Sequence, residues 1–124
     1  MTSKNKPEKN LKLFNFPKDG KASKNVLNKG LLITFEGGEG SGKSTQIKLL
    51  AKRLAKYGDV ITTREPGGTI EAEIIRNLLV KGKKNKWSGV VETLLLYAAR
   101  KDHIDKIIDP SLKKNKWVLC DRFK

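Results

Sequence analysis

The fold is decided by residues 31–45, which read LLITFEGGEGSGKST. Residues 37–44 fit the pattern G-x-x-x-x-G-K-[ST], the phosphate-binding loop of P-loop proteins. The run before the glycines is apolar and rich in β-branched and aromatic residues, so it predicts a buried strand. Residues 46–57 carry apolar side chains at helical spacing and predict a helix. A strand, a glycine loop and a helix in this order form the context that the motif requires, and they disfavour a chance match.

The glycine loop suits a polyphosphate for physical reasons. Glycine lets the backbone turn tightly and bring its N–H groups close to phosphate oxygens, and the next helix directs its positive end at the same anion. Lys43 can reach the β- and γ-phosphates of ATP, and the Ser44 hydroxyl can ligate Mg²⁺. The predicted ATP-binding residues are Gly37, Gly38, Glu39, Gly40, Ser41, Gly42, Lys43, Ser44 and Thr45.

The composition narrows the class of protein. The 124 residues carry a formal charge of +14, from 27 Lys and Arg against 13 Asp and Glu, which raises the question of nucleic acid. Aromatic residues make up only 6%, so a stacking surface for single strands is poorly supported and nucleic acid is an unlikely partner. The single Cys120 excludes an internal disulfide and fits a reducing compartment such as the cytoplasm. No apolar run approaches the roughly 18 residues of a membrane span, so no membrane is expected.

Residues 1–29 differ in composition from the rest of the chain. They contain eight lysines against Glu8 and Asp19, with one apolar island at 11–16. This composition predicts a basic, mostly disordered extension that is dispensable for chemistry. A targeting peptide, a contact with a partner and a misplaced start codon are the alternatives.

Residues 30–124 alternate between strand and helix patterns, which predicts an α/β fold. Strands are expected at 31–36, 60–63 and 117–121, and helices at 46–57, 69–80 and 90–108. Thr69 and Ser88 are the expected N-caps, and Pro110 is expected to end the third helix. The pattern predicts the N-terminal part of a three-layer P-loop NTPase domain with a parallel sheet. We expect the sheet to be incomplete, the chain to be truncated at its C-terminus, and the third strand to form an exposed apolar edge.

Charged residues follow the second and third strands. Ligands collect beyond the carboxyl ends of parallel strands, so Arg64 and Arg122 should lie beside the glycine loop. A guanidinium group matches phosphate bidentately, which suggests a second phosphate-bearing molecule there. Asp121 ends an apolar strand and is the expected acid beside Mg²⁺. Two phosphate sites that face each other predict transfer of a phosphoryl group.

Four stretches, in the same order, resemble the motifs of the thymidylate kinase family, in its bacterial type. Residues 35–46 are similar to the family's P-loop, 64–69 (REPGGT) to its second motif, 94–100 (LLLYAAR) to its thymidine-site helix, and 121–123 (DRF) to its DR[FY] motif. The P-loop alone is generic, but the second and third motifs make the resemblance specific.

The resemblance implies a dTMP kinase that uses ATP and Mg²⁺, forms a homodimer when full length and works in the cytoplasm. Arg64 and Arg122 would hold the acceptor phosphate, and Arg100 would hydrogen-bond the thymine. The implied catalytic residues are Lys43, Asp121 and Arg122, and the implied metal-site residues are Ser44 and Asp121. The implied dTMP-binding residues are Glu39, Arg64, Glu65, Pro66, Arg76, Leu96, Arg100 and Arg122.

The chain departs from the family pattern at two points. Leu96 stands where the family usually has a phenylalanine that stacks on thymine, which puts the thymine preference in question. The family's lid over ATP is absent, so we expect the 124-residue chain by itself to be inactive. Another nucleoside or nucleoside-monophosphate kinase, an inactive nucleotide-binding fragment and a basic nucleic-acid-binding module are the alternatives.

Three further residues carry expectations about packing. Tyr97 is expected in the core, His103 in a solvated or packing role, and Cys120 as a small buried hydrophobe.

Overall fold

Three short parallel strands form the centre of the domain in the computed structural model, which describes residues 29–123. They are β1 (Leu31–Phe35), β2 (Val60–Arg64) and β3 (Trp117–Asp121), in the spatial order β1-β3-β2. The predicted extension, apart from Lys29, and Lys124 lie outside the described residues.

The last strand in the sequence is the middle strand of the sheet. Leu31 and Val60 both pair with Trp117, and Phe35 and Arg64 both pair with Asp121. The expectation that β3 forms an exposed edge is therefore wrong. Its four apolar residues Trp117–Cys120 are all buried, as expected for a parallel strand covered on both faces.

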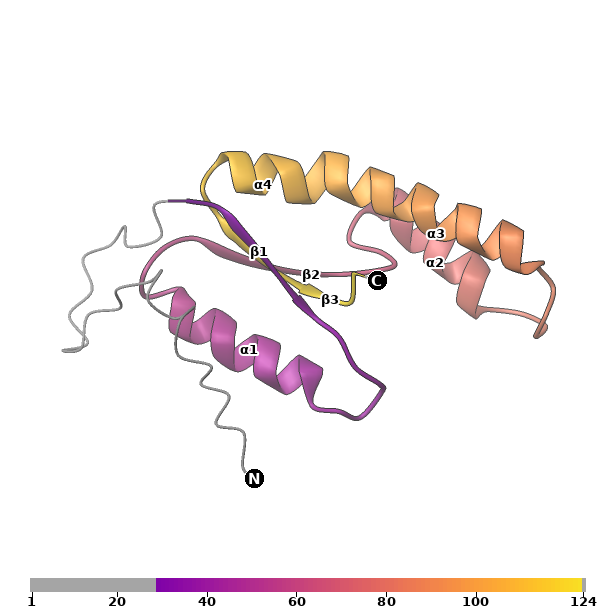
Figure 1. Ribbon diagram of the computed structural model, residues 1–124, viewed down its shortest axis with the longest axis horizontal. Helices are drawn as coiled ribbons and strands as arrows, with labels where there is room; N and C mark the ends of the chain where they lie inside the picture. The colour runs from indigo at the N-terminus through magenta and orange to yellow at the C-terminus, as the bar shows by residue number, and fades with distance from the viewer. Residues whose placement is uncertain (1–28, 124) are drawn as a thin grey trace, which may run out of the picture.

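The helices lie on both sides of the sheet, which confirms the three-layer α/β architecture (Figure 1). Helix α1 (Lys43–Leu54) covers one face, while α4 (Asp109–Lys113) lies over the other and α3 (Gly89–His103) extends beyond the ends of the strands. Helix α2 (Ile70–Val80) packs alongside α3. Thr69 caps α2 by accepting from the Ala72 N–H, and Ser88 caps α3 by accepting from the Val91 N–H, as predicted.

The core under α1 joins the first helix to the central strand. Ile47 and Leu54 of α1 pack with Trp117 and Leu119 of β3 in one buried cluster. The helix begins at Lys43, earlier than predicted, and ends at Leu54, before the predicted boundary at Tyr57. Because Lys43 is the first residue of α1, its side chain lies next to the glycine loop.

The predicted stop at Pro110 is wrong, because the helical segment continues to Lys113. A wider π-helical turn, η2 (Ile104–Ile108), follows α3 directly, and α4 begins at Asp109. Pro110 lies inside this continuous helical segment, just after the π-helical turn across which the Asp109 N–H bonds the Ile104 carbonyl. The extended helix brings Leu112 against Gly30, where a Cβ atom would lie 2.5 Å from the Leu112 carbonyl oxygen.

Cys120 is a small buried hydrophobe, as predicted. Its thiol donates to the Arg122 carbonyl oxygen, with 3.1 Å between the two atoms. Burial, with the nearby Glu65 carboxylate second, raises the pKa of Cys120 to about 12. The thiol is therefore a structural group rather than a nucleophile.

Between Lys29 and Phe123, no helix combines the length and the apolar character that crossing a membrane requires.

Candidate functional site

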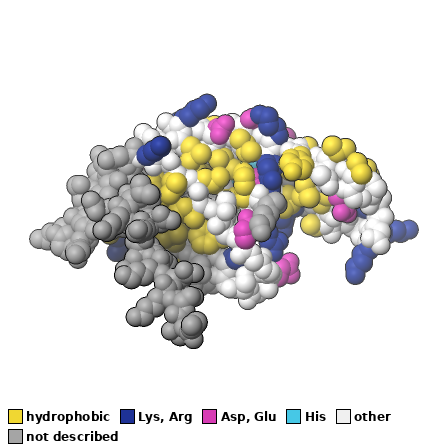
Figure 2. Space-filling view, in the orientation of Figure 1, with side chains coloured by type: hydrophobic (Ala, Val, Ile, Leu, Met, Phe, Trp, Pro, Cys, Tyr) yellow, Lys and Arg dark blue, Asp and Glu magenta, His cyan; other side chains and the backbone are white. Residues whose placement is uncertain are grey.

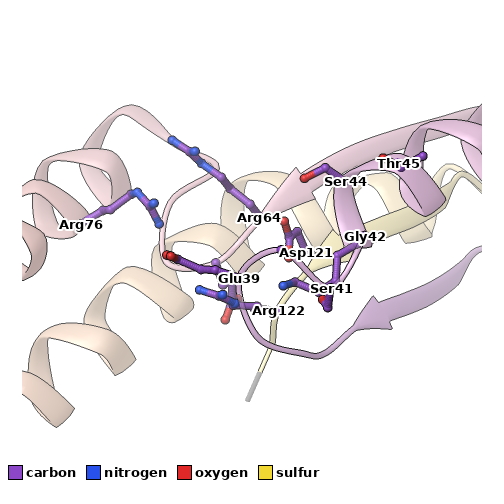
Figure 3. A pocket seen from close by; sticks show the side chains of 12 residues that line it. Glu39, Ser41, Gly42, Ser44, Thr45, Arg64, Arg76, Asp121 and Arg122 are labelled. Atoms are coloured by element: carbon purple, nitrogen blue, oxygen red, sulfur yellow. The ribbon is translucent and has the colours of Figure 1, made fainter.

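A cavity of about 430 Å³ opens at the carboxyl ends of the strands, where the glycine loop meets the residues that follow β2 and β3. Its lining residues are Glu39, Gly40, Ser41, Gly42, Lys43, Ser44, Thr45, Arg64, Glu65, Arg76, Asp121 and Arg122. Figure 3 shows Arg76, Glu39 and Arg122 gathered on one side, with Ser41 and Ser44 of the loop on the other. Residues from four separate segments of the sequence therefore share one cavity.

The glycine loop leaves its anion-binding groups open. Gly42 is the N-cap of α1, with a φ of 89°, and it provides no side-chain cap. The first N–H groups of α1 therefore face the loop without a side-chain acceptor from the cap residue. The Lys43 ammonium donates to the Gly37 and Gly38 carbonyl oxygens at 2.9 Å each, so it lies folded against the loop.

Arg64, the last residue of β2, lies on the α2 side of the cavity and pairs with Glu73. Its Nε atom donates to Oε1 of Glu73 at 3.2 Å and its terminal nitrogen to Oε2 at 3.0 Å. The Arg64 hydrogen bond, and then the Gly68 N–H, hold the pKa of Glu73 below its usual value. Two parallel bonds of this kind are the geometry in which a guanidinium also binds a phosphate.

A smaller cavity of about 70 Å³ adjoins the first one. It is lined by Glu65, Pro66, Leu96, Arg100 and Arg122, so two of its residues also line the larger cavity. Arg100 lies over the Phe123 ring, with 4.7 Å from its guanidinium carbon to the ring centre. Leu96 and Arg100 lie one helical turn apart on α3, which explains why both reach this cavity.

Arg122 and Asp121 are held where β3 ends. The Arg122 N–H donates to the Phe35 carbonyl at 2.9 Å, and its backbone adopts a left-handed φ of 66°. This turn directs the chain from the sheet edge into both cavities. The Asp121 Oδ1 atom is buried and has no hydrogen-bond partner within residues 29–123.

An unpaired carboxylate oxygen and a serine hydroxyl that line the same cavity, as Asp121 and Ser44 do, are the kinds of oxygen ligand that a Mg²⁺ ion bridged to phosphates uses. The residues therefore fit the predicted metal. In the described part of the chain, no cluster of three or more His, Cys, Asp or Glu could hold a metal without such phosphates.

Two of the packing expectations need correction. Tyr97 is not in the core, because 62% of it is exposed. Helical spacing turns it away from Leu96, toward the surface rather than toward the sheet. His103 is fully buried, so its expected solvated role is wrong and its packing role holds.

The sequence does not predict the polar partners of His103, and it does not predict that Glu73 pairs with Arg64. His103 contacts Glu65 and Thr63, which are 38 and 40 positions away. The one local signal is that His103 lies seven residues after Leu96 and three after Arg100, on the same face of the helix.

A parallel sheet with a glycine loop between β1 and α1, and with arginines from two strand ends in the same cavity as that loop, is the architecture of P-loop proteins. The family model "Thymidylate kinase" matches residues 35–124. The chain belongs to the thymidylate kinase family.

Individual relatives agree with this family. The chain is 59% identical over 98 residues to a thymidylate kinase of Caulobacter vibrioides, covering 78% of this chain and 47% of the relative. It is 59% identical over 95 residues to that of Bartonella quintana, covering 76% and 44%. A crystal structure of thymidylate kinase from Ehrlichia chaffeensis matches with a TM-score of 0.70 and 49% identity, over 77% of this chain and 51% of that one. The chain thus spans about half the length of its relatives.

Proposed function

We propose that the protein carrying this chain transfers the γ-phosphoryl group of ATP to dTMP, giving ADP and dTDP. The observation that carries the proposal is the shared cavity: a phosphate-binding loop and three arginines line the same 430 Å³. An ATPase needs no second set of phosphate donors, whereas a kinase with a phosphorylated acceptor does.

On the donor side, residues 37–45 would hold ATP. The backbone N–H groups and the α1 N-terminus would bind the phosphates, and Lys43 would exchange its carbonyl contacts for the β- and γ-phosphate oxygens. The Lys43 side chain is exposed, so it can leave the two carbonyl oxygens and reach the phosphates by changing its rotamer.

On the acceptor side, Arg64, Arg76 and Arg122 would bind the 5′-phosphate of dTMP, and Glu39 would approach the sugar. Arg64 already makes a bidentate contact with the Glu73 carboxylate, which has the shape and charge of a phosphate edge. The thymine would enter the smaller cavity against Pro66 and Leu96, with Arg100 on its polar edge.

Mg²⁺ would be held by Ser44 and Asp121 together with phosphate oxygens of ATP. When bound, the ion neutralises charge on the β- and γ-phosphates. The Asp121 Oδ1 atom, which has no partner among the described residues, supports this assignment.

The reaction itself needs positioning and charge neutralisation more than covalent chemistry. An oxygen of the dTMP phosphate forms a bond to the γ-phosphorus while the bond from that phosphorus to the β,γ-bridging oxygen breaks, and ADP leaves. Lys43 and Arg122 would stabilise the charge on the transferred group from opposite sides of the cavity.

The test is ADP release from ATP by the complete gene product that carries this chain, measured with dTMP and, in parallel, with dUMP, dCMP, dGMP and AMP. We expect kcat/KM to be highest for dTMP. If kcat/KM is highest for a nucleotide with a different base, the acceptor is that nucleotide instead of dTMP, and the proposed phosphoryl transfer still holds. ADP release that no nucleoside monophosphate stimulates would refute the kinase.

We further propose that the protein forms a homodimer through α2 and α3. Both helices leave large apolar side chains exposed, and Figure 2 shows yellow side chains gathered at that end of the molecule. The exposed residues are Ile70, Ile74, Leu78, Val80, Val90, Leu94, Leu96 and Tyr97. Such a patch is typical of an interaction surface.

The dimer predicts a change in sedimentation. The paired substitutions Ile74→Asp and Leu94→Asp should shift the complete gene product from dimer to monomer, because each places a charge in the apolar contact. Leu49→Asp, at an exposed position on α1, is the matched control and should leave the dimer intact.

We place the protein in the cytoplasm, where a free thiol such as Cys120 stays reduced.

A further inference from the structure

One carboxylate, that of Glu65, connects a buried histidine to the arginine of the smaller cavity. Its Oε2 atom accepts from Nε of Arg100 at 2.7 Å, and its Oε1 atom accepts from Nδ1 of His103 at 3.1 Å. An ionised carboxylate can only accept, so both partners are donors and Glu65 is held from two directions.

The His103 ring is fixed in turn. Its Nε2 atom shares a hydrogen bond of 2.6 Å with the Thr63 hydroxyl on β2. Gly68 leaves room for the ring, since a Cβ atom there would lie 2.5 Å from its Cδ2 and Nε2 atoms. His103 is 0% exposed and Glu65 6%, so water does not compete for these bonds.

The same contacts determine how Arg100 presents its guanidinium. The Nε atom is taken by Glu65, and one face of the group lies over the Phe123 ring. These two contacts leave the terminal nitrogens for the small cavity, which Leu96 lines without offering a π-face. Without aromatic stacking, the direction of the Arg100 hydrogen bonds contributes a larger share of base recognition.

We propose that His103 is a positioning residue for the acceptor nucleotide: it orients Glu65, and Glu65 orients Arg100, although the ring itself lines neither cavity. This inference rests on the proposed function. It states that affinity for dTMP depends on the His103 contact with Glu65, while affinity for ATP does not.

The alternative role is simple filling of the core between α3 and β2. Two substitutions separate the roles, because the two ring nitrogens have different partners. The amide of asparagine reaches the Nδ1 position, so His103→Asn can keep the bond to Glu65. The longer His103→Gln reaches the Nε2 position and can keep only the bond to Thr63. Both variants lose the imidazole ring, so if His103 only fills the core, both should lose stability and dTMP affinity.

The experiment measures the dissociation constants of dTMP and of an unreactive ATP analogue by calorimetry, with the melting temperature of each variant. It uses the complete gene product carrying wild-type, His103→Asn or His103→Gln sequence. We expect His103→Gln to weaken dTMP about tenfold and His103→Asn to stay within about threefold of wild type. Affinity for the ATP analogue should be unchanged in both.

A second pair tests the route through Glu65. In a Glu65→Gln background, His103→Gln should cause no further loss of dTMP affinity, since the carboxylate it would orient is gone. If both His103 variants fail to fold, Glu65→Gln alone carries the test: its amide has one accepting oxygen and cannot accept from both Arg100 and His103, so it should weaken dTMP while leaving the ATP analogue unchanged.

The outcomes separate the inference from the proposed function. A wild-type protein that does not bind dTMP refutes the function. A wild-type protein that binds dTMP, with equal losses in His103→Asn and His103→Gln that follow their melting temperatures, refutes the positioning role. Undiminished dTMP affinity in His103→Gln, or in Glu65→Gln where the His103 variants do not fold, refutes it as well.

Discussion

Replacing Lys43 by alanine is expected to lower dTMP-dependent ADP release by about 10²–10³-fold, the range seen when one charge-stabilising donor is removed from an active site. Lys43 is the first residue of α1 and its ammonium group lies at the glycine loop, 2.9 Å from two of its carbonyl oxygens. Removing it leaves the β- and γ-phosphates without their nearest mobile positive charge. Steady-state kinetics and ATP titration measure the loss in rate and in binding.

Lys52→Ala is the control for this prediction. Lys52 lies exposed in the last turn of the same helix, so its removal also costs one positive charge but far from the cavity. Its kinetics should match the wild type. Full turnover in Lys43→Ala would contradict the assignment of the P-loop to ATP.

Arg122→Ala is expected to lower kcat/KM for dTMP by about 10²–10³-fold while leaving ATP affinity nearly unchanged. Arg122 is the one arginine that lines both cavities, so in the proposed complex it would face the attacking phosphate of dTMP as well as the base site. Its left-handed φ of 66° is equally strained for alanine, so the substitution removes the guanidinium without changing the backbone penalty.

Two variants test the cause of this loss. Arg122→Lys keeps the charge and loses the fork, so it should recover only part of the activity. Arg53→Ala removes an exposed arginine at the end of α1 and should leave kcat/KM for dTMP unchanged. A large rise in the dissociation constant of ATP in Arg122→Ala would place this residue on the donor side instead.

The sequence predicts those parts of the fold that depend on local physics. The glycine loop, the caps at Thr69 and Ser88 and the apolar run of β3 each depend on a few neighbouring residues, and all appear as expected. The order of the strands depends on contacts between distant segments, and the expected edge position of β3 differs from its central position in the sheet. Pro110 is expected to end the third helix, but the helical segment widens into a π-helical turn just before it and continues to Lys113.

The candidate site divides in the same way. Arg64, Asp121 and Arg122 could be predicted to lie together, because the carboxyl ends of parallel strands meet at one edge. The carboxylates that orient the arginines could not be predicted. Glu73 contacts Arg64 where α2 lies beside the end of β2, and Glu65 contacts Arg100 where α3 lies beside the loop after β2, and no spacing in the sequence signals these contacts.

The central place of β3 has a consequence for how the chain acquires its structure. Neither β1 nor β2 has its native neighbour until β3 inserts between them, and Trp117 donates to a carbonyl 88 positions earlier. Closing so long a loop costs conformational entropy before any sheet hydrogen bond repays it, which makes folding slow. During synthesis, α1 and the glycine loop would leave the ribosome early but stay without their hydrophobic support. We therefore expect the glycine loop to become ordered only after the chain has been synthesised through β3.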